Sequence, residues 1–234
     1  MKKLTTLALL WLLALVPALA QTAPEIRSLA NFHAVEVSSG IEMHLASGQP
    51  QLVQASAETP ELLARIKTEV SDGVLKITFE RKLDEVWGKK NYIRNLRVNV
   101  TAAPLTALKA SSGATVEVAG PYATDNLQLE VSSGATLKAE FVTPALQARV
   151  SSGGVATVTG KIQRLDVQAS SGGEFKGGNL QATACEAAAS SGGTVAVAVQ
   201  ETLTAKASSG GDVRYTGSPK VTKHTSSGGS VKNR

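Results

Sequence analysis

Cysteine and aromatic residues are scarce in this chain of 234 residues, which contains one cysteine and has an aromatic content of 4%. A single cysteine excludes an internal disulfide, so stability has to come from packing and backbone hydrogen bonds. The three histidines, His33, His44 and His224, show no spacing that would place a base beside Cys185. We therefore expect Cys185 to be a small buried apolar side chain rather than a nucleophile.

Charged residues are also few, at 18%, and the formal net charge is +5. This excess is too small to indicate nucleic-acid binding without a concentrated basic patch, so no nucleic-acid partner is expected. No His, Cys, Asp or Glu spacing points to a metal or a cofactor, and neither is expected.

One long apolar run, Leu4 to Val16, follows Lys2 and Lys3 and precedes the small residues Ala18 and Ala20. This order predicts a secretory signal peptide over residues 1–20. The run is shorter than the roughly 20 residues that span a bilayer, so no transmembrane segment is expected after signal removal. The mature chain should be exported to the periplasm, the outer-membrane surface or the extracellular space.

What the chain has in abundance is a repeat. The tripeptide Ser-Ser-Gly begins at Ser38, Ser111, Ser132, Ser151, Ser170, Ser190, Ser208 and Ser226. From the second copy onward the intervals are 18 to 21 residues, about 19 on average, and five copies are followed by another glycine. Such a period is typical of a protein built from stacked structural units.

Apolar and polar residues alternate on both sides of each tripeptide, as in Leu127, Leu129 and Val131 before it and Val195 and Val197 after it. Alternation of this kind predicts half-buried strands, two in each repeat, joined by a glycine bend. A unit of about 19 residues cannot bury its own apolar face, so the units should stack with parallel strands. The prediction is an all-β solenoid in which small serine hydroxyls fit tight corners and bond to the backbone.

The first half of the mature chain is less regular. Residues 21–106 are expected to form the first, wider coils and a β cap, and residues 107–234 to form the repeats, with residues 21–234 as one continuous domain. Leu52–Ala57 is interpreted as the partner strand of Ile41–Leu45, and a helical turn is expected after Pro60. Asp72-Gly73 is a strong turn signal and predicts a hairpin over residues 70–79.

Two sets of residues are candidates for ligand binding. One is the segment from Arg81 to Arg97, where basic and aromatic side chains alternate and could grip an acidic polymer or a membrane surface. Its candidate residues are Lys82, Trp87, Lys89, Lys90, Tyr92 and Arg94. The alternative interpretation is a solvated excursion between two strands.

The other set is a column on the solenoid. Stacking aligns the sixth residue after each first serine, which gives Glu117, Lys138, Thr157, Lys176, Ala196, Arg214 and Lys232. The cations Lys138, Lys176 and Arg214 could meet an anionic glycan through many weak contacts. Alternatively, the charges only keep the surface soluble and prevent sheet association. Lys232 and Arg234 could protect an open edge, where a second chain could instead pair end to end.

A family resemblance rests on Phe32–Met43, Val70–Ile77, Leu96–Leu105 and the Ser-Gly coils. In these segments the sequence resembles the putative auto-transporter adhesin, head GIN domain family of exported bacterial proteins. The resemblance covers nearly all of residues 28–234. It implies a right-handed parallel β-helix-like solenoid and brings no defined catalytic residues.

Three functions remain open. The first is a non-catalytic, adhesin-like protein that binds or scaffolds a component of the cell envelope. The second is a polysaccharide lyase or hydrolase, for which clustered carboxylates are needed; the nearest approach is Asp166 with Glu186, expected at equivalent sites in adjacent coils. The third is a purely structural envelope protein. No catalytic residue is assigned.

Overall fold

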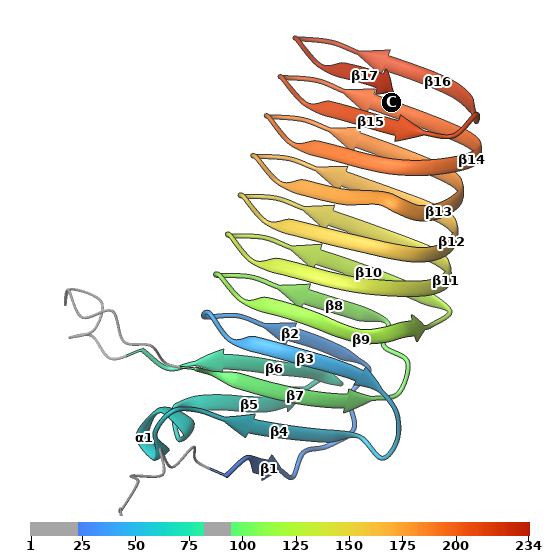
Figure 1. The fold of residues 1–234 in the computed structure, drawn as a ribbon. Helices are drawn as coiled ribbons and strands as arrows, with labels where there is room; N and C mark the ends of the chain where they lie inside the picture. Colours follow the sequence, from blue (N-terminus) through green and yellow to red (C-terminus); the bar gives the residue numbers. More distant parts are fainter. Residues whose placement is uncertain (1–22, 82–94) are drawn as a thin grey trace, which may run out of the picture.

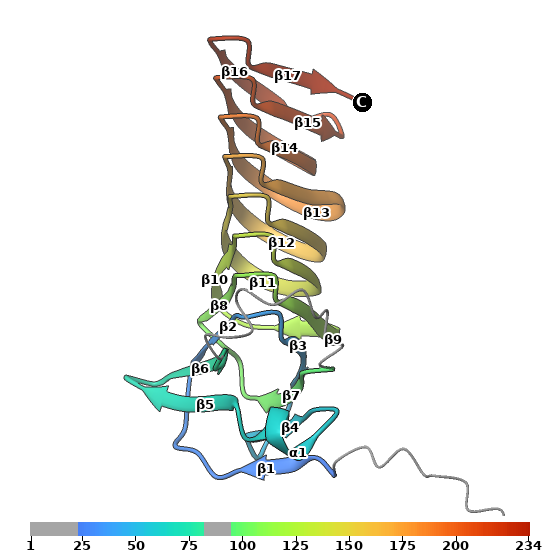
Figure 2. The same cartoon turned by 90° about the vertical axis from the view of Figure 1, so that its left-hand side faces the viewer.

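The computed structural model describes residues 23–81 and 95–234, which form a tall stack of β-coils above an irregular β-region (Figures 1 and 2). The predicted signal peptide lies outside the described residues. The lower part contains β1 (Glu25–Arg27), β2 (Ala34–Val37), β3 (Glu42–Ser47), β4 (Leu52–Ser56), α1 (Pro60–Leu63), β5 (Ile66–Ser71), β6 (Val74–Phe79) and β7 (Arg97–Ala102). The stack continues with β8 (Ala107–Ala110), β9 (Thr115–Ala123), β10 (Asn126–Val131), β11 (Thr136–Val150), β12 (Val155–Ala169), β13 (Glu174–Ala189), β14 (Thr194–Ala207), β15 (Asp212–Thr216), β16 (Lys220–Thr225) and β17 (Ser230–Asn233).

The strands form two faces that meet at the Ser-Ser-Gly turns. We call the strands that precede each turn the leading sheet; it contains β5, β6, β2, β8, β10, the second halves of β11 to β14, and β16. The strands that follow each turn form the trailing sheet, which contains β1, β4, β7, β3, β9, the first halves of β11 to β14, β15 and β17. Each coil thus contributes one strand segment to each face.

The register between coils follows the sequence repeat. On the trailing sheet Thr136 pairs with Val155, Val155 with Glu174, and Glu174 with Thr194, always in parallel. The solenoid of about seven coils with about 19 residues each is therefore confirmed. The hand of the coil stays a prediction.

Each Ser-Ser-Gly element is a tight turn with two residues in the left-handed region. The second serine has φ between 45° and 65° in all eight copies, and the glycine after it has φ between 69° and 75°. In the copy at Ser151, Gly154 N–H donates to the Ser151 carbonyl at 2.8 Å. Two positive φ angles inside such a bond define a type I′ turn, which reverses a strand within two residues.

Hydrogen bonds also connect the turns along the stack. The Gly40 N–H donates to the Ser112 carbonyl at 3.0 Å, and the Gly153 N–H donates to the Ser171 carbonyl at 3.2 Å. An equivalent bond from glycine N–H to serine carbonyl joins each turn to the next, so every turn is hydrogen-bonded to a neighbouring turn. We call this row of turns the turn ladder. Its serine hydroxyls do not follow the prediction: within the described residues Ser38 and Ser39 bond each other, and the hydroxyls of the other turns bond no protein group.

The residue after the tripeptide explains why a second glycine is common there. A Cβ built on Gly193 would lie 2.4 Å from the Ala169 carbonyl oxygen of the coil below. A real Cβ does not approach backbone so closely, so this coil spacing requires glycine. The equivalent positions lower in the stack hold Ala114 and Ala135, where the turn bond is longer, at 3.1 and 3.0 Å.

The core runs as one column between the two faces. It is lined by Val, Leu and Ala in the coils, with the fully buried aromatics Tyr122, Phe141 and Phe175 as its largest members. Tyr122 and Phe141 pack edge to face with centroids 6.5 Å apart. Burial of one such side chain contributes about 1.5–3 kcal/mol, so several in each coil offset the entropy cost of ordering it.

The first Ser-Ser-Gly copy belongs to the regular stack even though 73 residues separate it from the second. β2 and β3 pair in parallel with β8 and β9 above them and with β6 and β7 below. The described elements between β3 and β8, namely β4, α1, β5, β6 and β7, thus form an insertion that folds under the first coil.

We call the strands below that coil, together with α1, the cap (Figure 2). The hairpin at Asp72-Gly73 and the helical turn at Pro60 are confirmed. The predicted pairing of Leu52–Ala57 with Ile41–Leu45 is wrong, because β4 pairs antiparallel with β7 and β1 instead. Antiparallel pairs end the parallel stack at this side and leave β1 as a short edge.

Within the described residues, no helix has the length and apolar character needed to cross a membrane. At the other end of the stack, β16 pairs with β14, and β17 pairs with β15. End-to-end association of two chains stays a prediction.

Candidate functional site

The predicted column of charged residues stands on the outer face of the trailing sheet. Lys138 pairs in register with Glu117 and Thr157, and Lys176 pairs with Thr157 and Ala196. Arg214 lies between Ala196 and Lys232. The alignment that the sequence repeat predicted is therefore present, with one member in each coil.

Most cations of this column are paired with acids. The Lys176 ammonium lies 3.1 Å from Glu174, and the Arg214 guanidinium lies 2.6 Å from Asp212, in each case two residues earlier on the same strand. Lys138 is held more loosely, 3.9 Å from Glu117, and its side chain is 77% exposed. The column is thus a row of mixed charge, and Lys138 is the most exposed of the three cations that are paired.

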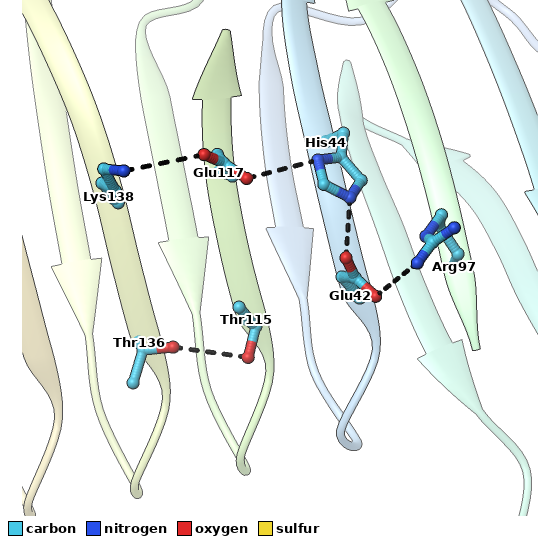
Figure 3. Close-up of polar contacts among 7 residues, drawn as sticks. All are labelled: Glu42, His44, Arg97, Thr115, Glu117, Thr136 and Lys138. Carbon is cyan, nitrogen blue, oxygen red and sulfur yellow. Dashed lines mark hydrogen bonds and ion pairs between the residues drawn. The ribbon is translucent and has the colours of Figure 1, made fainter. Parts of the chain in front are cut away.

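At its lower end the column continues into a polar network that joins three strands (Figure 3). His44 of β3 lies between two carboxylates, with Nε2 2.8 Å from Glu42 and Nδ1 3.8 Å from Glu117. The other oxygen of Glu42 accepts a hydrogen bond from Arg97 of β7 at 3.1 Å. Because Glu117 also faces Lys138, an unbroken series of polar side chains runs from the cap to the coils.

The network keeps Glu42 ionised. Burial acts to raise the pKa of Glu42, but the hydrogen bonds from His44 and Arg97 and their charges outweigh it, so the pKa lies below its ordinary value. A general acid in glycoside hydrolysis needs the opposite, a pKa raised so that a proton is available near neutral pH. Glu42 is therefore suited to an ion pair rather than to proton donation.

The carboxylate pair considered for catalysis is adjacent as predicted, since Asp166 and Glu186 are register partners in neighbouring coils. Each has a partner of its own. Gln147 donates to Asp166 at 3.5 Å, and Lys206 donates to Glu186 at 2.8 Å. Across the described ranges, no group of three or more His, Cys, Asp and Glu side chains is arranged to hold a metal ion.

Cys185 of β13 is buried in the core, where it precedes Glu186 in the chain and pairs in register with Leu165, the residue before Asp166. Burial, with smaller contributions from the charges of Asp166 and Glu186, raises the pKa of its thiol to about 12. Such a thiol is inert as a nucleophile near neutral pH, which confirms the interpretation of Cys185 as an apolar core residue.

The other predicted ligand residues, Lys82, Trp87, Lys89, Lys90, Tyr92 and Arg94, lie outside the described residues. Of the segment that carries them, Arg81 at the start and Arg97 at the end are described, and both are exposed. The structure joins Arg97 to the column through Glu42. A role of the segment in binding stays a prediction.

The sequence contained a signal for part of this network. His44 is the sixth residue after Ser38, so it belongs to the same column as Glu117 once the first repeat is aligned with the second. The contact with Arg97 had no comparable signal, because β7 lies outside the repeat.

Comparison with known proteins agrees with the fold. A search of curated proteins gives no match. Among solved structures, a putative adhesin from Bacteroides fragilis is similar with a TM-score of 0.77 and 17% identity, over 91% of this chain and 96% of that one. A putative adhesin from Parabacteroides distasonis has a TM-score of 0.71 and 19% identity over the same shares.

A third similar structure, a putative lipid binding protein from Parabacteroides distasonis, has a TM-score of 0.58 and 16% identity, over 90% of this chain and 96% of that one. Identities this low establish a shared fold. The family evidence is more direct, because residues 31–219 match the profile of one family along most of the chain. The chain belongs to the family described as putative auto-transporter adhesin, head GIN domain.

Proposed function

We propose that the mature chain is an exported, non-catalytic, adhesin-like protein that binds an anionic glycan or another cell-surface component at the bacterial envelope. Its family is named for adhesins, and similar structures carry the names of adhesins or a lipid binding protein rather than of enzymes. The signal-like order of residues 1–20 supports export.

The observation that carries the proposal is the alignment of equivalent side chains on the trailing sheet. Lys138, Lys176 and Arg214 repeat along the rod at intervals set by the strand spacing of about 4.8 Å. A polymeric ligand can contact several members of such a column at once. Weak single contacts then add to a useful affinity, because later contacts form within the same complex.

The pairing of the cations decides where binding starts. An anionic group has to compete with Glu174 for Lys176 and with Asp212 for Arg214. Lys138 presents less competition, because its partner is 3.9 Å away. Exposed pairs of this kind contribute about 0–1 kcal/mol each, so exchange of the acid for a ligand anion costs little.

The test measures binding of the fluorescently labelled mature chain to intact bacteria, before and after periodate oxidation of their surface glycans. The test variant combines Lys138→Gln, Lys176→Gln and Arg214→Gln. A matched control variant removes the same charge from the leading sheet through Lys109→Gln, Arg149→Gln and Lys206→Gln, where Lys109 and Lys206 are also ion-paired.

We expect the trailing-sheet variant to bind about tenfold less and the control variant to bind nearly as well as the original chain. Equal losses in both variants would show that net charge rather than the column is responsible. Absence of binding to any cell would overturn the adhesin-like function. Release of new reducing ends from the glycans would overturn its non-catalytic character.

A further inference from the structure

A shallow groove lies along the edge of the stack opposite the turn ladder, where the long strands bend from the trailing sheet to the leading sheet. It has a volume of about 260 Å³ and crosses β11, β12, β13 and β14. We call it the bend groove. Its lining includes Val142, Pro144, Lys161, Gln163, Gln181 and Gln200. Three strand intervals give it a length of about 14 Å along the rod.

The wall formed by β11 is held in place by a buried hydroxyl. The Thr143 side chain is 3% exposed, and its single hydroxyl proton can be donated to the carbonyl of Asp125 at 3.2 Å or to that of Ala145 at 3.0 Å. These bonds fix the bend of β11. They also hold Val142 outward, where 41% of it is exposed, one of two large apolar side chains in the described chain that face solvent. The groove therefore has a rigid, partly apolar wall before any ligand arrives.

The opposite side of the groove is polar. Val142, Lys161 and Gln181 are register partners in successive coils, so an apolar surface, an ammonium and a carboxamide follow one another along the rod. Within the part of the chain that the structure describes, Lys161 forms no ion pair, and Gln163, Gln181 and Gln200 form no side-chain hydrogen bond. The lining contains one cation and no carboxylate. Its donors and acceptors are free for a ligand.

This set of groups suits a sugar chain that carries carboxylates. A carboxamide both donates and accepts, so it can pair with hydroxyls in either role. The C–H face of a sugar ring can cover Val142 and Pro144, which removes apolar surface from water. An ammonium without an acidic partner adds a charge-assisted bond to a carboxylate.

We propose that the bend groove binds a segment of a uronic-acid polysaccharide, with its carboxylate on Lys161 Nζ and its hydroxyls on the amides of Gln163, Gln181 and Gln200. The groove is smaller than the pockets of about 300–1,000 Å³ that enclose small ligands, and it is open along the rod. Both properties fit a stretch of polymer that passes through it. This inference rests on the proposed adhesin-like function and assigns it a ligand class and a second surface.

A peptide ligand is disfavoured by the backbone around the groove. Extended peptides usually bind by adding a strand to an open sheet edge. The backbone of β12 and β13 is paired on both sides, with β11 and β14 as outer neighbours, so it offers no such edge. Binding has to use side chains, and those present favour hydroxyls and carboxylates.

The experiment measures affinities of the full mature chain for hyaluronan and alginate fragments by calorimetry, with dextran as a neutral polysaccharide and an unrelated peptide library as a second comparison. Lys161→Gln removes the cation, and Gln181→Glu places a carboxylate in the groove at nearly constant size. Lys220→Gln is the matched control, because it removes the same charge from an exposed site on the leading sheet, outside both the groove and the column. Lys138→Gln tests the column itself. Circular dichroism checks that each variant is folded.

We expect the original chain to bind at least one uronic-acid fragment more tightly than dextran. Lys161→Gln should weaken that binding about tenfold, as loss of a charge-assisted bond predicts. Gln181→Glu should abolish it by repulsion, and the control Lys220→Gln should change it less than twofold.

Three results would overturn the inference about the groove: no binding of either uronic-acid fragment, binding that Lys161→Gln and Gln181→Glu leave unchanged, or selection of a peptide instead. If Lys138→Gln removes the binding and Lys161→Gln does not, the column is the glycan site. The proposed function then stands while the groove loses its role. If the chain binds cells but no uronic-acid fragment, the proposed function also stands and the groove again loses its role.

Discussion

The cap and the coils bury their apolar residues in different ways. In the cap, strands pair antiparallel, as in β4 with β7 and β5 with β6, and large side chains such as Leu75, Ile77 and Phe79 fill the interior. In the coils, strands pair in parallel at a fixed interval, and many inward positions are alanine or valine. The narrow coil cannot hold many large side chains, so it relies on repetition of identical contacts.

Each region supplies what the other lacks. A stack of coils has open strand edges at its ends, and repeat proteins need an end unit to prevent association there. The cap covers one end with antiparallel strands, and the first coil, β2 with β3, is placed on it. Substitutions that affect one region and not the other can test how far the two depend on each other.

The largest expected effect is on the reactivity of Cys185, which reports on the coils because the cap has no cysteine. The pKa of its thiol is raised from 9.0 to about 12, so the native protein at pH 8 should react with iodoacetamide about a thousandfold more slowly than the unfolded chain. Mass spectrometry measures both rates. Native labelling within tenfold of the unfolded rate would contradict the burial.

Labelling of Cys185 can also show whether the cap and the coils unfold together. Leu75→Ala weakens the cap where it meets the first coil, several coils away from Cys185 in β13. Faster labelling of Cys185 in this variant would show that the two regions open together, and unchanged labelling would show that they open separately.

The next largest effect is expected from Phe175→Ala, which removes a fully buried ring from the coils. Loss of such a side chain lowers the free energy of unfolding by about 3–5 kcal/mol. Phe79→Ala is the counterpart in the cap and should cost a similar amount. Urea denaturation followed by circular dichroism measures both, and a loss below about 1 kcal/mol at Phe175 would contradict the tight packing of the coil.

A smaller effect is expected from Gly193→Ala in the turn ladder. The new Cβ would meet the Ala169 carbonyl oxygen, so the coil has to shift, at a cost of about 1–3 kcal/mol. Ala135→Gly makes the opposite change at the equivalent position nearer the cap and should cost less than about 1 kcal/mol. If the two variants lose equal stability in thermal denaturation, the close approach of the upper coils is not what requires glycine.

The smallest effect is expected from Glu42→Gln, at the junction of cap and coils. The pKa of Glu42 is lowered in the folded state, so its ionised form stabilises the fold above the ordinary pKa of 4.5, and this contribution is lost as the pH falls through the lowered value. The carboxylate is well exposed, so the variant should lose only a few tenths of a kcal/mol at pH 7.

The difference between the original chain and Glu42→Gln should be smaller at about pH 3 than at pH 7, because Glu42 gains protons as the pH falls. Urea midpoints at the two pH values measure it, with Glu140→Gln as a control on an exposed acid. A difference that grows as the pH falls would contradict the sign of the shift.

The repeat was sufficient to predict the coils, because neighbours along the rod are residues at equal positions in successive units. It gave the alternation of buried and exposed residues and the register of the charged column, down to the contact of Glu117 with Lys138. The ion pairs of Lys176 with Glu174 and of Arg214 with Asp212 were not predicted, although residues two apart on a strand share a face.

The cap was less predictable because its contacts join residues without a repeating relation. Nothing local distinguishes β3 from β7 as the partner of β4, and the choice depends on how the insertion folds under the first coil. The pairing of Arg97 with Glu42 depends on the same arrangement. The bend groove was missed for a related reason: its residues lie where the strands change face, and the alternation of buried and exposed positions carries no information about a hollow there.

The turn ladder has a consequence for the order of assembly. A serine with left-handed φ costs about 1–2 kcal/mol, so an isolated turn would not persist. Every completed turn presents an amide and carbonyl groups to the coil that follows, and bonding to them offsets that cost. Synthesis delivers the cap and the first coil before the others. We therefore expect growth from the cap outward, each coil serving as a template for the next, so that the rod can lengthen by whole coils without any change to its base.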